Sequence, residues 1–181
     1  VQFDAALRGS LRRHRQSLAA LAEGHGGVPE ALEWPGLDEY ESEALVQAIH
    51  PEPLPPATTP ELFRHHFRLL REALTRWMAG ETAPRGMPSY ADWVAGIQGA
   101  LDHVRQTARG DVLMVTSGGP ISTAVARLLG APPTSAIDLN WQIRNSSVTE
   151  FHFTPERHAL VCWNHIPHLH APERRDWVTR T

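Results

Sequence analysis

The segment from Asp111 to Ile121 constrains the fold of this chain more than any other, because a run of aliphatic residues stops at two glycines and a helical pattern follows at once. A short, continuous apolar run indicates a strand whose two faces are both covered, as in a parallel sheet. Pro120 suits the first turn of a helix, where its missing N–H is not needed. The segment therefore predicts an α/β fold with a mostly parallel sheet and helices on both faces, in which residues 112–115 form a central strand.

The turn between this strand and this helix has the properties of an anion site. The first N–H groups of a helix have no partner within the helix, and the helix dipole places positive charge there. Gly118 and Gly119 let the backbone approach a bound anion closely. An ordinary strand-to-helix turn would show the same pattern, so the turn alone leaves both interpretations open.

Length, charge and cysteine content narrow the function classes. The chain has 181 residues, enough for one domain with a full core, and a formal net charge of −3, which argues against nucleic acid and an anionic membrane surface as partners. All 17 Lys+Arg residues are arginine, so lysine-based chemistry is excluded. Cys162 is the single cysteine, which rules out an intrachain disulfide and fits a cytoplasmic protein. No apolar run is long enough to span a membrane.

Two long helices with capping signals are predicted in the middle of the chain. One begins at Thr59, and the other begins at Ser89, whose partner in a capping box is Asp92. We expect residues 51–110 to form a helical cap inserted into a single α/β domain that spans residues 1–181.

Local patterns predict the remaining elements. They are a strand over 1–7, a helix over 11–23 capped by Ser10, a short strand over 31–34, and an antiparallel hairpin of 147–153 with 159–163 at the edge of the sheet.

Five segments of the chain occur in the order typical of one enzyme family. They are Gly9-Ser10-Leu11-Arg12-Arg13-His14-Arg15-Gln16-Ser17, Leu37-Asp38-Glu39, Thr116-Ser117-Gly118-Gly119, Asn145-Ser146-Ser147-Val148-Thr149 and Asn164-His165-Ile166-Pro167-His168-Leu169. This series resembles the histidine phosphatase superfamily, also called phosphoglycerate-mutase-like, whose segments read Ser-x-Leu-x-Arg-Ala-x-x-Thr, Leu-x-Glu, Ser-His-Gly-Gly, Asn-x-Ser-Val-Thr and Asn-x-x-x-His-Leu. The resemblance covers nearly the whole chain and implies a three-layer αβα sandwich.

The chain departs from the family pattern at two places. The family's nucleophilic histidine lies in an Arg-His-Gly segment, which this sequence does not contain. We expect the N-terminal segment that would carry it to be missing from this sequence, which begins at what would be the family's second strand. Ser117 stands where the family has a second histidine, so it keeps one hydrogen bond and supplies no positive charge.

The resemblance assigns roles to four residues. Arg13 would bind the phosphate as a bidentate fork, together with Ser117 and the Gly118 amide at the helix N-terminus. Glu39 would give the leaving alcohol its proton, with a pKa raised by the nearby phosphate charge, and Ser117 would join it as a catalytic residue. Structural alternatives stay open: Arg13 as one more exposed arginine, Glu39 as part of an acidic loop, and Ser117 as a simple helix cap.

The function implied is a metal-independent phosphomonoesterase that works through a phosphohistidine, a histidine-phosphatase-type phosphoric monoester hydrolase from a bacterium. The resemblance implies an enzyme without a cofactor, whose substrate is a phosphorylated small molecule or protein. A dimer is the oligomeric state that we consider. Two alternatives remain: an impaired pseudo-phosphatase that binds phosphorylated ligands, and a non-catalytic α/β interaction domain. If the protein is an active phosphatase, we expect Ser117→His to raise its turnover.

Two other chemistries are disfavoured by spacing. His165, His168 and His170 fit no standard zinc pattern, and no cysteine accompanies them. Ser117 as the nucleophile of a serine hydrolase lacks the glycine that the G-x-S-x-G turn requires two residues earlier, where Val115 stands.

Overall fold

A computed structural model describes residues 1–180 of the chain. The chain folds into two compact units, which are described separately below. The first consists of Val1–Glu39 together with the chain from Ala95 onward, and the second consists of Tyr40–Val94.

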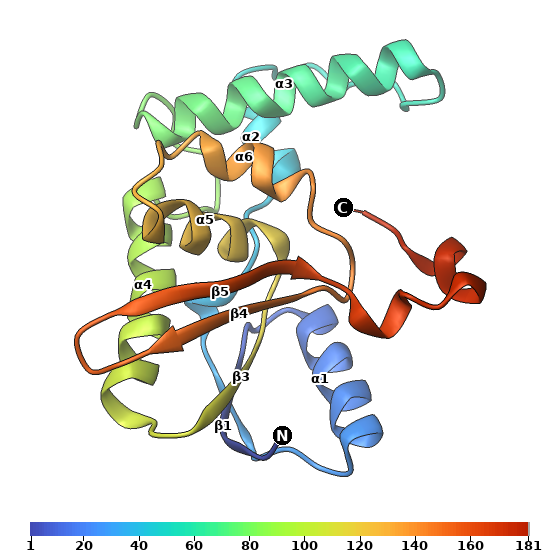
Figure 1. Cartoon of the computed structure of the whole chain (residues 1–181). Helices are drawn as coiled ribbons and strands as arrows, with labels where there is room; N and C mark the ends of the chain where they lie inside the picture. Colours follow the sequence, from blue (N-terminus) through green and yellow to red (C-terminus); the bar gives the residue numbers. More distant parts are fainter. Residues whose placement is uncertain (181) are drawn as a thin grey trace. The chain divides into compact units, whose positions relative to one another are not determined.

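The elements of both units are shown in Figure 1. The strands are β1 (Phe3–Arg8), β2 (Ala31–Glu33), β3 (Asp111–Val115), β4 (Val148–Phe153) and β5 (His158–His165). The α-helices are α1 (Arg12–His25), α2 (Ser42–Gln47), α3 (Pro60–Met78), α4 (Tyr90–Thr107), α5 (Gly118–Leu128) and α6 (Ser135–Asn140). Short 3₁₀ helices are η1 (Pro35–Leu37), η2 (Pro167–Leu169) and η3 (Pro172–Trp177).

The first unit is built on a parallel sheet with the strand order β2-β1-β3. Ala6 of β1 pairs with Ala31 of β2, and Leu7 pairs with Met114 of β3. The prediction that residues 112–115 form a central strand is therefore wrong for the residues described, because β1 is central and β3 pairs with β1 alone. An apolar run indicates that both faces of a strand are covered. It does not show whether the strand pairs with one neighbouring strand or with two.

Helices cover the parallel sheet, so the predicted α/β fold class is confirmed. Leu7 is 2% exposed and packs with Ala100 and Val104 of α4 in one apolar cluster. Successive side chains of a strand point to opposite faces, so the neighbouring buried residue Ala6 belongs to the other face of β1. The helix α1 packs along β1 and β3 (Figure 1). Two covered faces explain why the strands read as apolar runs without alternation.

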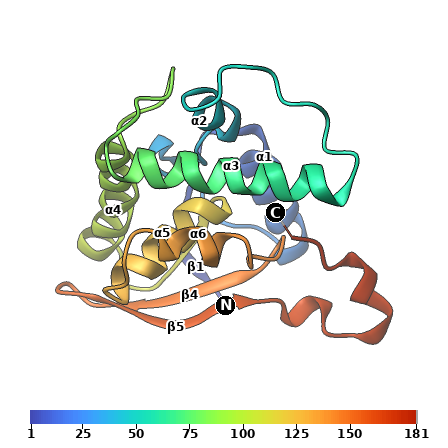
Figure 2. The ribbon, with the colours of Figure 1, turned by 90° about the horizontal axis from the view of Figure 1, so that it is seen from above.

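The antiparallel hairpin predicted near the C-terminus exists, but its place in the sheet was predicted wrongly. Strands β4 and β5 pair with each other in a separate two-stranded sheet. Phe153 of β4 packs against the apolar cluster of the first unit, and α5 packs against β5. In both views α5 and α6 lie side by side (Figure 1, Figure 2). Within residues 1–180 no ladder joins the hairpin to β1–β3, so it is held by side-chain packing and by hydrogen bonds such as that from Arg105 to the Pro155 carbonyl at 2.8 Å.

The start of α1 differs from the sequence prediction in its cap. Leu11 occupies the N-cap position, and no side chain there accepts a bond from the first turn. The Ser10 hydroxyl donates instead to a carboxylate oxygen of Asp38, and the Ser10 N–H donates to the other oxygen at 2.6 Å. Ser10 thus fixes the loop before the helix to the segment after η1.

The second unit is organised around aromatic side chains. Trp77 of α3 is 1% exposed, and the rings of Tyr40, Tyr90 and Trp93 lie around it at centroid distances of 6.3, 5.2 and 5.5 Å. The predicted start of the long helix is confirmed, because the Thr59 hydroxyl accepts from the Leu62 N–H at 3.3 Å.

The predicted start of the second helix is confirmed as well. The Ser89 hydroxyl accepts from the Asp92 N–H at 3.1 Å and donates to the Asp92 carboxylate at 2.6 Å, as a capping box requires. The predicted role of this part of the chain as a cap stays a prediction. Among residues 1–180, no helix combines the length and the apolar character needed to cross a bilayer.

Candidate functional site

The candidate site lies where β1 and β3 end. Both strands run in the same direction, so their carboxyl ends meet at one edge of the sheet, and α1 and α5 begin beyond that edge (Figure 1). The Gly9 N–H donates to the Val115 carbonyl at 3.1 Å and continues the pairing past the end of β1. In open α/β sheets, this edge is the usual position of a ligand site.

Ser117 is the point at which the two helices meet. It occupies the N-cap position of α5, but its hydroxyl makes no capping bond to that helix. The Ser117 Oγ accepts from Arg13 Nε at 3.1 Å and lies 2.7 Å from Nε2 of His14, both from α1. The alternative that Ser117 merely caps the helix is therefore wrong, because its side chain is used by α1.

Glu39 joins this group through the backbone of α5. Its Oε2 accepts from the Gly119 N–H at 2.9 Å, two residues beyond Ser117. The structure thus brings Arg13, Glu39 and Ser117 together from three separate segments of the first unit. The Gly119 N–H, which the sequence suggested as a phosphate donor, donates to Glu39 here.

Gly118 has a packing reason to be glycine. A Cβ built there would lie 2.2 Å from Oδ1 of Asn140, the buried last residue of α6. The glycine therefore allows α6 to approach the first turn of α5, which holds the N-terminus of α5 in place. Its assignment as a phosphate ligand stays a prediction.

Asp38 is a site residue that the sequence reasoning passed over. Its Oδ1 accepts from the N–H groups of Ser10 and Leu11, at 2.6 and 3.3 Å, and the Ser10 hydroxyl donates to Oδ2. Oδ1 also lies 3.5 Å from Nδ1 of His14. Three donors from the loop before α1 thus hold the carboxylate beside the imidazole.

His14 is the second residue that was missed. It is 2% exposed, and its ring lies between Ser117 on the Nε2 side and Asp38 on the Nδ1 side. Burial lowers the pKa of His14 below its usual value of 6.5, and the neighbouring Arg13 lowers it further, while Asp38 acts in the opposite direction. The imidazole is therefore neutral at neutral pH.

Gly9 leaves the space that this arrangement needs. A Cβ at Gly9 would lie 2.2 Å from His14 Nδ1 and 2.5 Å from Asp38 Oδ1. Any larger residue would have to separate the imidazole from the carboxylate. The signal was present in the sequence as a glycine directly after a strand, but only the structure shows what approaches it.

The two later motif segments have structural roles. Asn164 is 5% exposed with a left-handed φ of 58°, and its side chain donates to the Gln142 carbonyl at 2.7 Å and accepts from the Arg144 N–H at 2.9 Å. His168 Nε2 lies 2.9 Å from the hydroxyl of Ser146. Within residues 1–180, no group of three His, Cys, Asp or Glu side chains could hold a metal ion.

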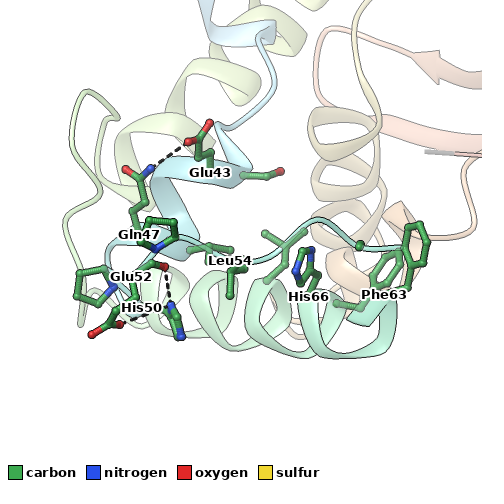
Figure 3. A pocket seen from close by; sticks show the side chains of 14 residues that line it. Glu43, Gln47, His50, Glu52, Leu54, Phe63 and His66 are labelled. Carbon is green, nitrogen blue, oxygen red and sulfur yellow. Dashed lines mark hydrogen bonds and ion pairs between the residues drawn. The ribbon is translucent and has the colours of Figure 1, made fainter. Parts of the chain in front are cut away.

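A hollow of about 600 Å³ in the second unit lies between α2, the loop after it and the first turns of α3 (Figure 3). Phe63 and Phe67 of α3 line it and are 53% and 44% exposed. At its rim His50 Nδ1 lies 3.7 Å from a carboxylate oxygen of Glu52. None of the predicted site residues lines this hollow.

Comparison with known proteins identifies the fold and the family. The model of the histidine phosphatase superfamily (branch 1) matches residues 1–166. The native structure of a mycobacterial glucosyl-3-phosphoglycerate phosphatase matches with a TM-score of 0.58 and 22% identity, covering 90% of this chain and 78% of that one. A structure described as mycobacterial hydrolase 1 matches with the same TM-score and identity, covering 90% and 77%. Among curated protein sequences there is no match.

Proposed function

This chain belongs to the histidine phosphatase superfamily, and we propose that the protein is a metal-independent phosphomonoesterase that works through a phosphohistidine. The observation that carries the proposal is the meeting of Arg13, Ser117 and Glu39 at the N-terminus of α5. The family nucleophile belongs to an Arg-His-Gly segment, which residues 1–181 do not contain. The proposal therefore concerns a protein in which that segment is present.

The geometry suits a phosphoryl group for electrostatic reasons. A phosphomonoester carries nearly two negative charges at neutral pH, so its site needs fixed donors and positive charge. Arg13 is exposed and supplies a guanidinium beside Ser117, and the first turn of α5 supplies the positive end of a helix dipole. Glu39, bound to the same turn, is the candidate donor of a proton to the leaving alcohol. The phosphatase among the similar structures supports the same substrate class.

Binding of inorganic phosphate to the 181-residue chain tests the site without requiring turnover. Arg13→Ala should weaken phosphate binding about 10- to 100-fold, because a hydrogen bond to a charged group contributes roughly 1.5–3 kcal/mol. Arg12→Ala is the matched control, since Arg12 is the exposed neighbour of Arg13 on α1. Titration calorimetry should separate the two variants. Equal losses for both would mean that phosphate only senses the overall charge.

Turnover is tested in the protein that carries the Arg-His-Gly segment. It should hydrolyse simple phosphomonoesters slowly, and added chelator should leave the rate unchanged. During turnover, a phosphoryl group should be trapped in an acid-labile bond to the histidine of that segment. A rate that chelator abolishes would contradict the proposed mechanism.

The second candidate is a pseudo-phosphatase that binds phosphorylated ligands without turnover. Ser117 favours it, because a neutral hydroxyl replaces an imidazole that could carry charge. Phosphate binding that depends on Arg13, without turnover in the longer protein, would establish this candidate. A chain that neither binds phosphate nor turns over would leave the non-catalytic interaction domain. A cytoplasmic location and a dimeric state remain predictions.

A further inference from the structure

We propose that Ser117 is itself a nucleophile toward phosphoryl groups, with His14 as its base and Asp38 as the residue that positions the imidazole. Ser117 Oγ lies 2.7 Å from His14 Nε2, and His14 Nδ1 lies 3.5 Å from Asp38 Oδ1. The first contact is the hydrogen bond by which a serine is activated in unrelated hydrolases, and the second places a carboxylate beside the far side of the imidazole, an arrangement that is recognised by geometry and not by spacing in the sequence. The inference goes beyond the proposed function, because it places a covalent intermediate on a residue of this chain.

The imidazole is held in the orientation that a base requires. The carboxylate of Asp38 faces Nδ1, so the ring proton is favoured on Nδ1 and the lone pair of Nε2 points at the Ser117 hydroxyl. The Nδ1 distance is about half an ångström longer than an ordinary N–H···O bond, which is common for such contacts before substrate binds. The Ser10 and Leu11 N–H groups donate to the same oxygen, Oδ1, and the Ser10 hydroxyl donates to Oδ2, so the carboxylate is fixed in place. Asp38 is thus held by the loop before α1, and His14 Nδ1 lies beside it at a distance that must shorten for a hydrogen bond to form.

The protonation state of His14 agrees with this role. His14 is 2% exposed as a residue, and desolvation together with the charge of Arg13 lowers its pKa. A neutral imidazole at neutral pH can accept the proton of Ser117. Ser117 is half-buried, so a substrate can reach its hydroxyl while the base stays protected from water.

The surroundings of Ser117 select the kind of electrophile. Arg13 Nε lies 3.1 Å from Ser117 Oγ, and the N-terminus of α5 begins at the next residue. Both favour an electrophile whose oxygens carry negative charge, so a phosphomonoester suits the site better than a neutral carboxylic ester. The same positive charge stabilises the developing alkoxide of Ser117.

Two departures from the family pattern occur in direct contact. Ser117 stands where the pattern has histidine, and His14 stands where the pattern Arg-Ala has alanine. The two residues are 103 positions apart in the sequence, yet their side chains lie within hydrogen-bond distance. Relative to the family pattern, the imidazole is therefore contributed by α1, and a hydroxyl stands at the N-cap of α5.

The proposed step balances without a further reactant. The Ser117 Oγ–P bond forms while the P–O bond to the alcohol breaks on the opposite side of phosphorus; His14 Nε2 takes the Ser117 proton, and Glu39 gives a proton to the departing oxygen. Water then attacks the phosphoserine and gives its proton to Glu39, His14 returns its proton to Ser117 Oγ as the Oγ–P bond breaks, and inorganic phosphate leaves. No redox partner and no metal is consumed in either half.

The test is covalent labelling of the 181-residue chain by a fluorophosphonate, followed by mass spectrometric mapping. A single label on Ser117 is expected, at a rate that rises with pH as His14 loses its proton. His14→Gln should slow labelling about a hundredfold or more and remove this pH dependence. Asp38→Asn should shift the midpoint of the profile to lower pH, because the lost carboxylate no longer raises the pKa of His14. Ser42→Ala, at an exposed serine that begins α2, should change nothing.

A second arm uses a radiolabelled phosphomonoester, p-nitrophenyl phosphate. We expect an acid-stable phosphoryl adduct on Ser117, in contrast to the acid-labile phosphohistidine of the proposed function. The position of the phosphoryl group is mapped on the unaltered chain, so this experiment does not depend on whether a variant folds. No label on Ser117, or a label whose rate is the same in His14→Gln, would overturn the inference. If the longer protein formed an acid-labile adduct and no acid-stable one, that result would also overturn the inference, but it would leave the proposed function intact.

Discussion

The arrangement of His14 and Asp38 makes the Gly9→Ala substitution informative. The added Cβ would lie 2.2 Å from His14 Nδ1 and 2.5 Å from Asp38 Oδ1, distances that real Cβ atoms do not show. The imidazole is buried and Asp38 is held by Ser10, so neither can give way without losing contacts. Overpacking of this kind costs about 1–3 kcal/mol. In a chain of this length, that lowers the melting temperature by about 2 to 12 °C.

The matched control is Gly24→Ala on α1. Its Cβ would meet no atom within 4 Å, and alanine is preferred over glycine within a helix. We therefore expect Gly24→Ala to leave the melting temperature unchanged or raise it slightly. Differential scanning calorimetry measures both variants, and fluorophosphonate labelling adds a second readout. Gly9→Ala should also slow labelling of Ser117, because His14 is pushed off its Asp38 contact.

The opposite result would refute the reasoning. If Gly9→Ala melted at the same temperature as the unaltered chain and labelled at the same rate, the imidazole and carboxylate would not occupy the space beside Gly9. A lower melting temperature with unchanged labelling would mean that the packing is as described and that the His14–Asp38 contact does not position the base.

Three further substitutions have defined outcomes. In the protein that carries the Arg-His-Gly segment, Ser117→His should raise turnover of p-nitrophenyl phosphate about 100-fold or more, because an imidazole can supply the positive charge that the hydroxyl lacks. The folded chain binds a proton on His14 less readily than the unfolded chain, whose value is near 6.5, so stability should fall as the pH drops below that value. Urea midpoints at about pH 7.5 and about pH 5.5 should differ less in His14→Gln than in the unaltered chain. Thr59→Ala should cost the second unit about 1 kcal/mol in urea unfolding, because the Leu62 N–H loses its acceptor, and should leave phosphate binding unchanged.

Elements with a local cause were predictable from the sequence. The start of α3 at Thr59 and the capping box of Ser89 and Asp92 depend on residues three positions apart, and both are confirmed. The errors concern contacts made far along the chain. Ser10 has the residue type of a cap, but Asp38 offers its hydroxyl a charged acceptor, which is a stronger bond than a neutral one.

The site residues also fall into two groups, those that the sequence indicated and those that it did not. The order of the motifs predicted Arg13, Glu39 and Ser117 as site residues, and the structure places all three together. His14 and Asp38 were not found, because a histidine in an arginine-rich helix and an aspartate in an acidic loop each have an ordinary solvent-exposed interpretation. Helical spacing puts Arg13 and His14 about 100° apart on α1, so the sequence does not show that both reach Ser117.

The rule that disfavoured Ser117 as a nucleophile concerns one way of exposing a serine. The G-x-S-x-G pattern supplies a sharp turn in which small neighbours leave room for the hydroxyl and its base. In this chain Val115 belongs to β3 and is buried, while the room is provided elsewhere, by Gly9 at the end of β1. The base also comes from α1 and approaches Ser117 from outside its own segment. Spacing around a serine therefore cannot decide whether it is activated, since the glycine that matters here, Gly9, follows a strand far from Ser117 in the sequence.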